Sequence, residues 1–316
     1  MNKIPSVDLK DFLSEDPVRK QKFINEIGNA YETIGFVALK GHFLDETLVE
    51  GLYTEVKKFF ELPLEVKQSY EIPGIGGQRG YVSFGKESAK GKKEGDLKEF
   101  WHFGQYVQNN PELEKEYPPN VNVQELPDFN QVGKEAYRML EKTAKYVLRA
   151  LAKYLDLEET YFDEYIHNGN SILRPIHYPP ITNEPDEAVR AAAHGDINLI
   201  TLLMGAQGRG LQVQNHKGDW IDAIAESDEL MINVGDMLSR HSNNKLKSTI
   251  HRVVNPPREL WGSSRYSIPF FMHPISSMKL NVLESCIDEN NPKQYSDITA
   301  GEFLNERLIE LGLIKK

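Results

Sequence analysis

Residues 194–204 read His194-Gly195-Asp196-Ile197-Asn198-Leu199-Ile200-Thr201-Leu202-Leu203-Met204, a polar triplet followed by an apolar run. The apolar part, Ile197–Met204, has the length of a strand and ends at a glycine-containing turn. Short runs of the same kind recur between residues 170 and 273, with glycine or asparagine turns between them. Many short strands separated by such turns predict a sandwich or jelly roll. The other expected strands are Ser171–Tyr178, Gly210–Gln214, Leu230–Val234, Ser248–Val254 and Tyr266–His273.

Helical spacing characterises the residues on both sides of this β-rich region. Asp16 and Asp45 each precede an apolar stripe and mark expected helix starts. The longest stripe predicts a helix over 132–154 that backs a sheet. Thr299-x-x-Glu302 has the spacing of a capping box before a final helix. The sequence therefore predicts an α+β fold with a mainly β core.

The composition indicates a globular protein with an acidic surface. Of the 316 residues, 40% are hydrophobic, enough for a substantial core. Acidic residues outnumber basic ones by 47 to 37, so the charge balance argues against a nucleic-acid partner. Cys286 is the only cysteine, which excludes an intramolecular disulfide and a cysteine-based zinc site. We expect a cytoplasmic protein with no membrane contact, because neither a signal-peptide core nor a membrane-spanning apolar run occurs. Nothing in the sequence marks an oligomer interface.

His194, Asp196 and His251 form the candidate metal site. In an extended segment, side chains at i and i+2 point to one face, so His194 and Asp196 can hold one ion together. His251 lies in the expected strand Ser248–Val254, and an imidazole that points from it into an apolar interior needs a partner. Two histidines and one carboxylate match the ligand set of non-haem Fe(II) oxygenases. Zinc also binds such a set, and the spacing alone leaves both metals open.

A candidate anion anchor follows in the last expected strand. Arg265 and Ser267 share one face of an extended segment. An arginine directed into a barrel is costly to bury without an anion, and a guanidinium with a neighbouring hydroxyl suits a carboxylate. Tyr178, on an earlier strand, can add a second hydroxyl. The structural alternatives are an internal ion pair for Arg265 and a core position for Tyr178.

Taken together, these residues resemble the isopenicillin N synthase-like branch of the 2-oxoglutarate/Fe(II) dioxygenases. The resemblance covers nearly the whole chain and rests on the order His194-x-Asp196, His251, Arg265-x-Ser267. Further segments that resemble the family are Ile4–Leu9, Gly35–His42, Tyr178–Pro180, Gly210–Val213, Asn233–Asp236 and Ser248–Val253.

The resemblance implies a double-stranded β-helix (jelly roll) flanked by helices, with Fe(II), 2-oxoglutarate and O₂ as cofactor and cosubstrates. The implied iron ligands are His194, Asp196 and His251. The implied cosubstrate-binding residues are Arg265, Ser267, Tyr178 and Arg174. The expected regions are a mixed α/β N-terminal dioxygenase region at 1–120, a long scaffold helix at 121–165, the Fe(II)/2-oxoglutarate jelly-roll core at 166–280 and a C-terminal helical segment at 281–316.

The implied activity is the hydroxylation or other oxidation of a small molecule, coupled to decarboxylation of 2-oxoglutarate to succinate and CO₂. One alternative is an Fe(II) oxidase of the same family that needs no 2-oxoglutarate, with Arg265 and Ser267 holding a substrate carboxylate instead. The other alternative is a β-barrel binding protein without catalytic activity.

Candidate substrate contacts lie mainly around residues 73–95, where glycine, serine and lysine predict a long loop. Long loops in compact domains are often functional, so this one is a candidate lid. Arg79 suits an anionic substrate, whereas simple packing of the loop on the barrel is the structural alternative. The candidate contacts are Arg79, Tyr81, Phe84, Phe100 or Trp101, and Phe271.

Overall fold

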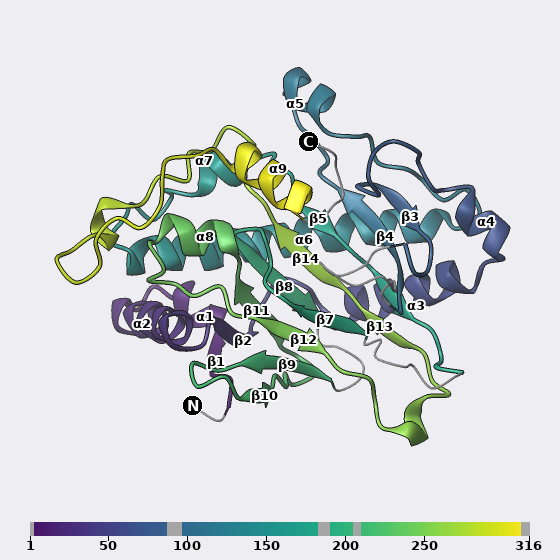
Figure 1. Cartoon of the computed structure of the whole chain (residues 1–316), viewed down its shortest axis with the longest axis horizontal. Helices are drawn as coiled ribbons and strands as arrows, with labels where there is room; N and C mark the ends of the chain where they lie inside the picture. Colours follow the sequence, from purple (N-terminus) through teal and green to yellow (C-terminus); the bar gives the residue numbers. More distant parts are fainter. Residues whose placement is uncertain (1–2, 87–96, 183–189, 205–209, 311–316) are drawn as a thin grey trace.

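The computed structural model describes residues 3–86, 97–182, 190–204 and 210–310. These residues form two facing β-sheets, with long helices packed behind the larger one (Figure 1). The larger sheet has the order β1-β2-β11-β8-β14-β5-β4-β6-β13, with β3 paired to β4, and the smaller sheet has the order β10-β9-β12-β7. This arrangement is a jelly roll flanked by helices, which confirms the predicted fold class.

The strands of the larger sheet are β1 (Ser6–Asp8), β2 (Phe36–Lys40), β3 (Gly80–Val82), β4 (Glu99–Gly104), β5 (Ile172–Leu173), β6 (Ile176–Tyr178), β8 (Ile200–Met204), β11 (Leu230–Val234), β13 (Arg265–Ser267) and β14 (Pro269–Met272). Those of the smaller sheet are β7 (Ala191–His194), β9 (Leu211–Gln214), β10 (Trp220–Asp222) and β12 (His251–Val253). The α-helices are α1 (Leu9–Phe12), α2 (Pro17–Thr33), α3 (Glu46–Glu61), α4 (Leu64–Gln68), α5 (Pro111–Glu116), α6 (Pro127–Tyr154), α7 (Asp163–Ile166), α8 (Asp236–His241) and α9 (Ala300–Glu310). Two short 3₁₀ turns cover Arg258–Leu260 and Glu284–Cys286.

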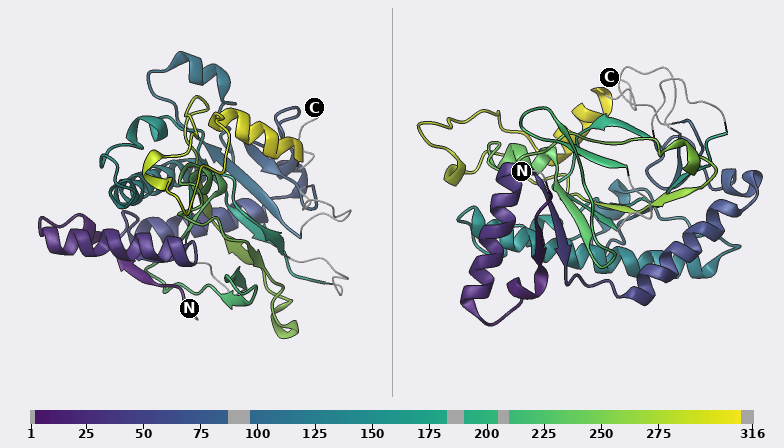
Figure 2. Two further views of the ribbon diagram at one scale, coloured as in Figure 1. Left: turned by 60° about the vertical axis from the view of Figure 1, so that its left-hand side comes forward. Right: turned by 90° about the horizontal axis from the view of Figure 1, so that it is seen from below.

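Helix α6 is the scaffold on which the larger sheet rests. It packs against β4, β5, β8 and β14. It also runs beside α3, as the view from below in Figure 2 shows. Aromatic rings fill the space between these layers, and Phe59 of α3 stacks on Phe129 of α6 with 4.9 Å between ring centroids. Trp101 of β4 meets Phe59 edge-on from the sheet side. No helix in the described parts of the chain is long and apolar enough to cross a membrane.

The predicted helix starts are confirmed. The carboxylates of Asp16 and Asp45 accept hydrogen bonds from the backbone N–H groups of Val18 and Leu48, so each caps its helix. Thr299 and Glu302 form the reciprocal bonds of a capping box ahead of α9.

The strand predictions were less accurate. The stretch Ser171–Tyr178 is broken into β5 and β6, because Pro175 between them has no N–H for a sheet ladder. The last predicted strand, Tyr266–His273, divides into β13 and β14, since its two halves pair with different partners, β6 and β8. The loop predicted over 73–95 contains the short strand β3, and its residues 87–95 lie outside the described residues. Strands β4, β7 and β10 were not predicted.

A second, smaller hydrophobic core lies between the two sheets. It shows which face of each strand points into the barrel. Phe36 and Ala38 of β2 and Met231 of β11 pack there against Val213 and Val253 of the smaller sheet. Side chains alternate along a strand, and directly paired residues on neighbouring strands share a face. Every residue in register with Phe36 on the larger sheet therefore also points into the barrel.

We predict that alanine at two helix glycines has opposite effects on stability. A Cβ on Gly133 of α6 comes within 2.3 Å of the buried Phe103 ring, so Gly133→Ala should destabilise the fold by about 1–3 kcal/mol. At Gly51 of α3 the nearest atom, on Val132, is 3.9 Å away, so Gly51→Ala should stabilise it by about 0.5–1 kcal/mol. Urea unfolding of both variants measures the difference, and an equal shift in both would show that α6 does not approach the sheet this closely.

Candidate active site

Three candidate metal ligands meet where the two sheets close on each other. His194 ends β7, Asp196 follows two residues later, and His251 begins β12 directly opposite His194 in the antiparallel pair. The Oδ1 atom of Asp196 lies 3.9 Å from Nε2 of His194 and 3.8 Å from Nε2 of His251. All three ligand atoms lie within 4.8 Å of one another, so the three side chains converge on one place where an ion could bind.

Backbone carbonyls orient both imidazoles. Nδ1 of His194 lies 2.7 Å from the carbonyl oxygen of Ala192, and Nδ1 of His251 lies 3.1 Å from that of Thr249. A carbonyl only accepts hydrogen bonds, so each Nδ1 carries the proton and each Nε2 presents a lone pair. This is the tautomer that a metal ligand requires, because the second ring nitrogen fixes the orientation of the first.

The carboxylate of Asp196 is held from its other side by the larger sheet. Its Oδ2 atom accepts hydrogen bonds from Oγ1 of Thr201 at 2.6 Å and Nδ2 of Asn233 at 2.8 Å, which leaves Oδ1 for the metal. Burial raises the pKa of Asp196, but His251 and His194, together with these hydrogen bonds, lower it further, so that the net pKa is below its usual value. The carboxylate is therefore ionised and ready to bind a cation at neutral pH.

The residues beneath the metal site form one row across the larger sheet. Phe36, Asn233, Thr201 and Phe271 are successive partners in register on β2, β11, β8 and β14. The two polar members bind Asp196, and Phe36 meets the His251 ring edge-on at 5.5 Å. Phe271 shares this face and lies next to Thr201, so it borders the space beside the metal site.

The predicted carboxylate anchor is buried, and its guanidinium has no hydrogen-bond or ion-pair partner among the residues that the structure describes. Arg265 of β13 pairs in register with Tyr178 of β6, and its guanidinium lies 5.1 Å from the Tyr178 ring centroid. The Arg265 side chain is 3% exposed, and its three guanidinium nitrogens have no hydrogen-bond partner among the described residues. Ser267 is buried on the same strand face. A buried guanidinium without an acceptor is costly, so the donors present fit a carboxylate ligand.

The comparison with known proteins agrees with this geometry. Residues 4–125 match the family described as non-haem dioxygenase in morphine synthesis N-terminal, and residues 169–274 match the 2OG-Fe(II) oxygenase superfamily. The proline hydroxylase buaE of Petromyces alliaceus is 30% identical over 97% of this chain and 99% of its own length. A crystal structure of a 2OG-Fe(II) oxygenase family protein from Caulobacter crescentus has 41% identity and a TM-score of 0.89, covering 98% of this chain and 100% of that one. The chain belongs to the 2-oxoglutarate- and Fe(II)-dependent oxygenases.

A further solved structure, of a full-length Neurospora crassa protein in complex with alpha-KG (2-oxoglutarate), is 31% identical with a TM-score of 0.84 and covers 97% of this chain and 96% of that one. Another structure of the same Neurospora crassa protein also contains thymine. This oxygenase therefore uses Fe(II), 2-oxoglutarate and O₂, as the sequence resemblance implied, and the His-Asp-His set provides a site for iron.

Arg174 lies among residues predicted to contact the substrate. Its guanidinium is 4.5 Å from the Phe100 ring centroid and 5.3 Å from that of Phe271, and Nε donates a hydrogen bond to Nε2 of His102. Phe100 also packs with Ile176 and Tyr178 in one small cluster. Arg174 therefore lies beside two of the predicted substrate contacts, and its predicted contact with the cosubstrate stays a prediction.

Arg79 is fully enclosed at the far end of the row that contains Phe271. Gly104 of β4 and Phe271 of β14 both pair with Ile172 of β5, so the three positions share the inward face. A Cβ on Gly104 would lie 1.8 Å from the Arg79 guanidinium carbon, which places that group over the glycine on this face. Nε and Nη2 of Arg79 have no hydrogen-bond partner among the described residues, while Nη1 donates to the carbonyl of Gln78.

The remaining predicted substrate residues lie elsewhere. The Tyr81 hydroxyl donates a hydrogen bond to the carboxylate of Glu99, which accounts for its burial structurally. Trp101 is part of the core beneath α3 and α6, on the opposite face of β4 from Phe100. Phe84 is 50% exposed at the surface. Their predicted contacts with a substrate remain predictions.

The sequence reasoning missed Arg190, a second buried arginine beside the anchor. Its side chain is 4% exposed, and its guanidinium lies 5.7 Å from the Tyr178 ring centroid. Burial, followed by the charge of Arg265, lowers the pKa of Arg190 to about 10, so it remains a cation at neutral pH. No sequence signal marked this residue, because it lies outside every predicted strand.

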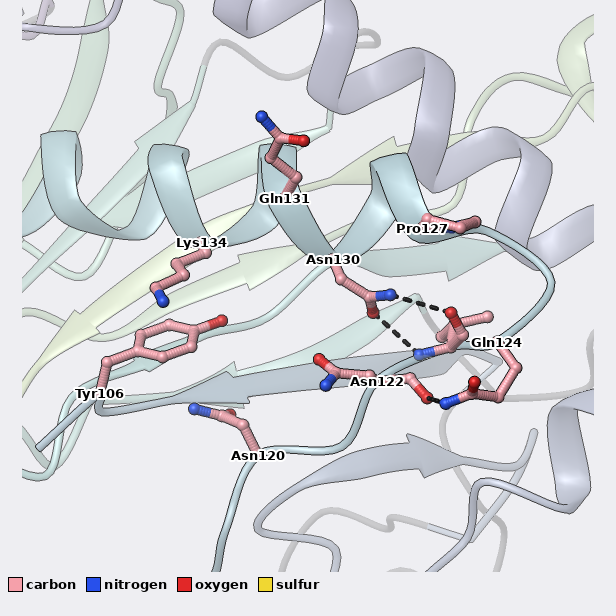
Figure 3. A pocket seen from close by; sticks show the side chains of 9 residues that line it. Tyr106, Asn120, Asn122, Gln124, Pro127, Asn130, Gln131 and Lys134 are labelled. Atoms are coloured by element: carbon pink, nitrogen blue, oxygen red, sulfur yellow. Dashed lines mark hydrogen bonds between the residues drawn. The ribbon is translucent and has the colours of Figure 1, made fainter.

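A separate surface pocket of about 540 Å³ lies at the start of α6 (Figure 3). Its polar lining is mostly carboxamide side chains, and two of them are engaged in structure: Asn130 bonds to both backbone groups of Val123, and Asn120 to both of Gly104. The pocket lacks the convergent titratable groups of a catalytic site. Its lining residues are Tyr106, Asn120, Asn122, Val123, Gln124, Pro127, Asn130, Gln131 and Lys134.

We predict that Thr201→Val weakens metal binding by about 10–100-fold, because it removes one of the two donors that orient the Asp196 carboxylate. Anaerobic titration with Fe(II) or Mn(II) measures the affinity. The matched control is Thr143→Val, which removes a buried hydroxyl that bonds to the Met139 carbonyl in α6. Equal losses of affinity in both variants would contradict a specific role for Thr201.

Proposed function

We propose that this oxygenase oxidises a small anionic molecule, with iron held by His194, Asp196 and His251 and 2-oxoglutarate held through its distal carboxylate by Arg265. The observation that carries the cosubstrate assignment is the guanidinium of Arg265, which is buried opposite Tyr178 and lacks an acceptor among the described residues. A carboxylate satisfies these donors in the planar geometry that a guanidinium offers.

The residues of the chain prepare the reaction by holding and orienting its components. His194, Asp196 and His251 would hold Fe(II) as a set of two histidines and one carboxylate, the ligand set that non-haem Fe(II) oxygenases use with positions left for cosubstrate and O₂. When bound, Fe(II) and 2-oxoglutarate supply the oxidising chemistry, in which O₂ is consumed and 2-oxoglutarate is decarboxylated to succinate and CO₂ as the substrate is oxidised. Phe36 and Phe271 flank the polar pair Asn233 and Thr201 along the floor of the site, and their rings limit the access of water.

The inward face beyond the metal site supports an anionic substrate. Phe271 and Phe100 offer aromatic surface, and the Arg174 guanidinium lies against both rings. Arg79 adds a second cation on the same face, with two donors that have no partner among the described residues. The names of two relatives, a proline hydroxylase and a protein crystallised with thymine, support a small polar substrate in general.

A panel of candidate substrates tests this proposal. Succinate release above the uncoupled background should rise with small carboxylates or other anions more than with neutral analogues of the same size. The neutral members should include flat heterocycles, since the aromatic surface also suits those. O₂ uptake should require 2-oxoglutarate, and uptake that is independent of it would point to the oxidase alternative instead.

We predict that Arg265→Gln weakens 2-oxoglutarate binding at least about thirtyfold, since one partner of a buried charge pair is lost. The binding constant comes from the visible absorption band of the anaerobic Fe(II)–2-oxoglutarate complex, titrated with the cosubstrate. Metal affinity should remain unchanged, because Arg265 is not a ligand.

Arg149→Gln is the matched control for this variant. Arg149 pairs with Asp163 at 2.6 Å, on helices α6 and α7. It should lose stability without a change in 2-oxoglutarate binding. If Arg265→Gln bound 2-oxoglutarate as tightly as the control does, the cosubstrate assignment would be wrong.

A further inference from the structure

We propose that Arg190 is a second anchor for the distal carboxylate of 2-oxoglutarate, acting together with Arg265. This inference rests on the proposed cosubstrate site. It adds a residue that immediately precedes β7, whereas Arg265 lies on β13 of the other sheet. The cosubstrate would thereby be held by one guanidinium from each sheet.

Arg190 and Arg265 lie beside the same aromatic ring. The guanidinium carbons of Arg190 and Arg265 lie 5.7 Å and 5.1 Å from the centroid of the same ring, that of Tyr178. Both arginine side chains are more than nine-tenths buried. Tyr178 is paired in register with Arg265, so the second guanidinium lies beside the anchor and not elsewhere in the barrel.

Arg190 and Arg265 also lack hydrogen-bond acceptors among the described residues. A buried arginine with a structural role normally has a carboxylate or several carbonyls as acceptors. Across the parts of the chain that the structure describes, neither Arg190 nor Arg265 forms a hydrogen bond or an ion pair with another residue, and Nε of Arg190 is buried without an acceptor. Two cations that repel each other and lack an acceptor need an anion, and a carboxylate can receive donors from both.

The distance from the metal identifies which end of the cosubstrate is bound. Arg190 lies four residues before His194, and four residues of extended chain span roughly 13 Å. The keto acid end of 2-oxoglutarate must reach the metal, so a guanidinium beside Tyr178 and Arg265 would meet the opposite end. That end carries the distal carboxylate, which the proposed site places beside Tyr178 and Arg265.

The test compares two ligands that differ only in this carboxylate. Binding of 2-oxoglutarate and of 2-oxovalerate, the five-carbon 2-oxo acid without a distal carboxylate, is measured by calorimetry on the anaerobic Mn(II)-loaded protein. Arg190→Gln should weaken 2-oxoglutarate binding by about tenfold or more and leave 2-oxovalerate binding unchanged. Arg149→Gln, away from the barrel interior, should change neither constant.

A stability measurement provides a second readout that does not depend on turnover. Without ligand, Arg190→Gln should melt at the same temperature as the parent protein or higher, because it removes one of two neighbouring buried cations. With saturating 2-oxoglutarate, its gain in melting temperature should be smaller than that of the parent. Arg190→Lys keeps the charge but not the planar guanidinium. Its affinity for 2-oxoglutarate should therefore lie between those of the parent protein and of Arg190→Gln.

The outcomes separate this inference from the proposed function. If the parent protein does not bind 2-oxoglutarate, the cosubstrate site itself is wrong. If the parent binds it and Arg190→Gln binds equally well, Arg190 alone is misassigned. Equal weakening of both ligands, or an effect confined to the KM of the oxidised substrate, would also overturn the inference, because neither depends on the distal carboxylate.

Discussion

The carboxylate of Asp196 joins the two sheets of the jelly roll, and the active site depends on that junction. One oxygen accepts hydrogen bonds from Thr201 and Asn233 on the larger sheet, and the other faces two histidines of the smaller sheet. A buried carboxylate is stable only when both oxygens have partners, so the register of β8 with β11 must bring the two donors together. The pairings of β2 with β11 and of β14 with β8 place Phe36 and Phe271 on either side of these donors. The support for Asp196 and the aromatic floor beside it therefore come from three neighbouring strand pairings.

The strands that carry the proposed cosubstrate anchor, Arg265 and Tyr178, are also joined on the outer face of the sheet. His177, between the inward residues Ile176 and Tyr178, points outward, where Nδ1 lies 2.7 Å from a Glu99 oxygen. Nε2 of the same ring lies 3.0 Å from the hydroxyl of Ser264, the residue before Arg265. The two strands that carry the anchor are therefore joined by side chains as well as by backbone hydrogen bonds. The pKa of Glu99 is raised by its burial, but His177, Tyr81 and Lys67 lower it more, so the carboxylate stays ionised.

Features of the site that depend on neighbouring residues in the chain could be predicted from the sequence. Features that depend on the pairing of distant strands could not. His194 and Asp196 are two positions apart in the chain, and so are Arg265 and Ser267. In an extended segment this spacing puts both members of a pair on one face, so the sequence alone indicates both pairs. The position of Phe271 beside Thr201 requires β14 to pair with β8, and no spacing expresses a contact between strands that far apart in the chain. Strand β7 is equally invisible, because Ala191-Ala192-Ala193 has no alternation of polar and apolar residues. Arg190 was missed for that reason, although the strand that follows it ends in a predicted ligand.

The distribution of charge explains how an acidic protein can bind an acidic cosubstrate. The chain carries a formal net charge of −10, yet the described interior contains Arg265, Arg190 and Arg79 with buried donors that have no acceptor. Surface charges are screened by salt over about 10 Å, whereas charges within a low-dielectric cavity are screened much less. A dicarboxylate at the mouth of the barrel therefore responds mainly to the cations inside it. In the proposed site, the metal at one end and the guanidinium groups at the other would fix its direction, because only a 2-oxo acid with a second carboxylate satisfies both ends at once.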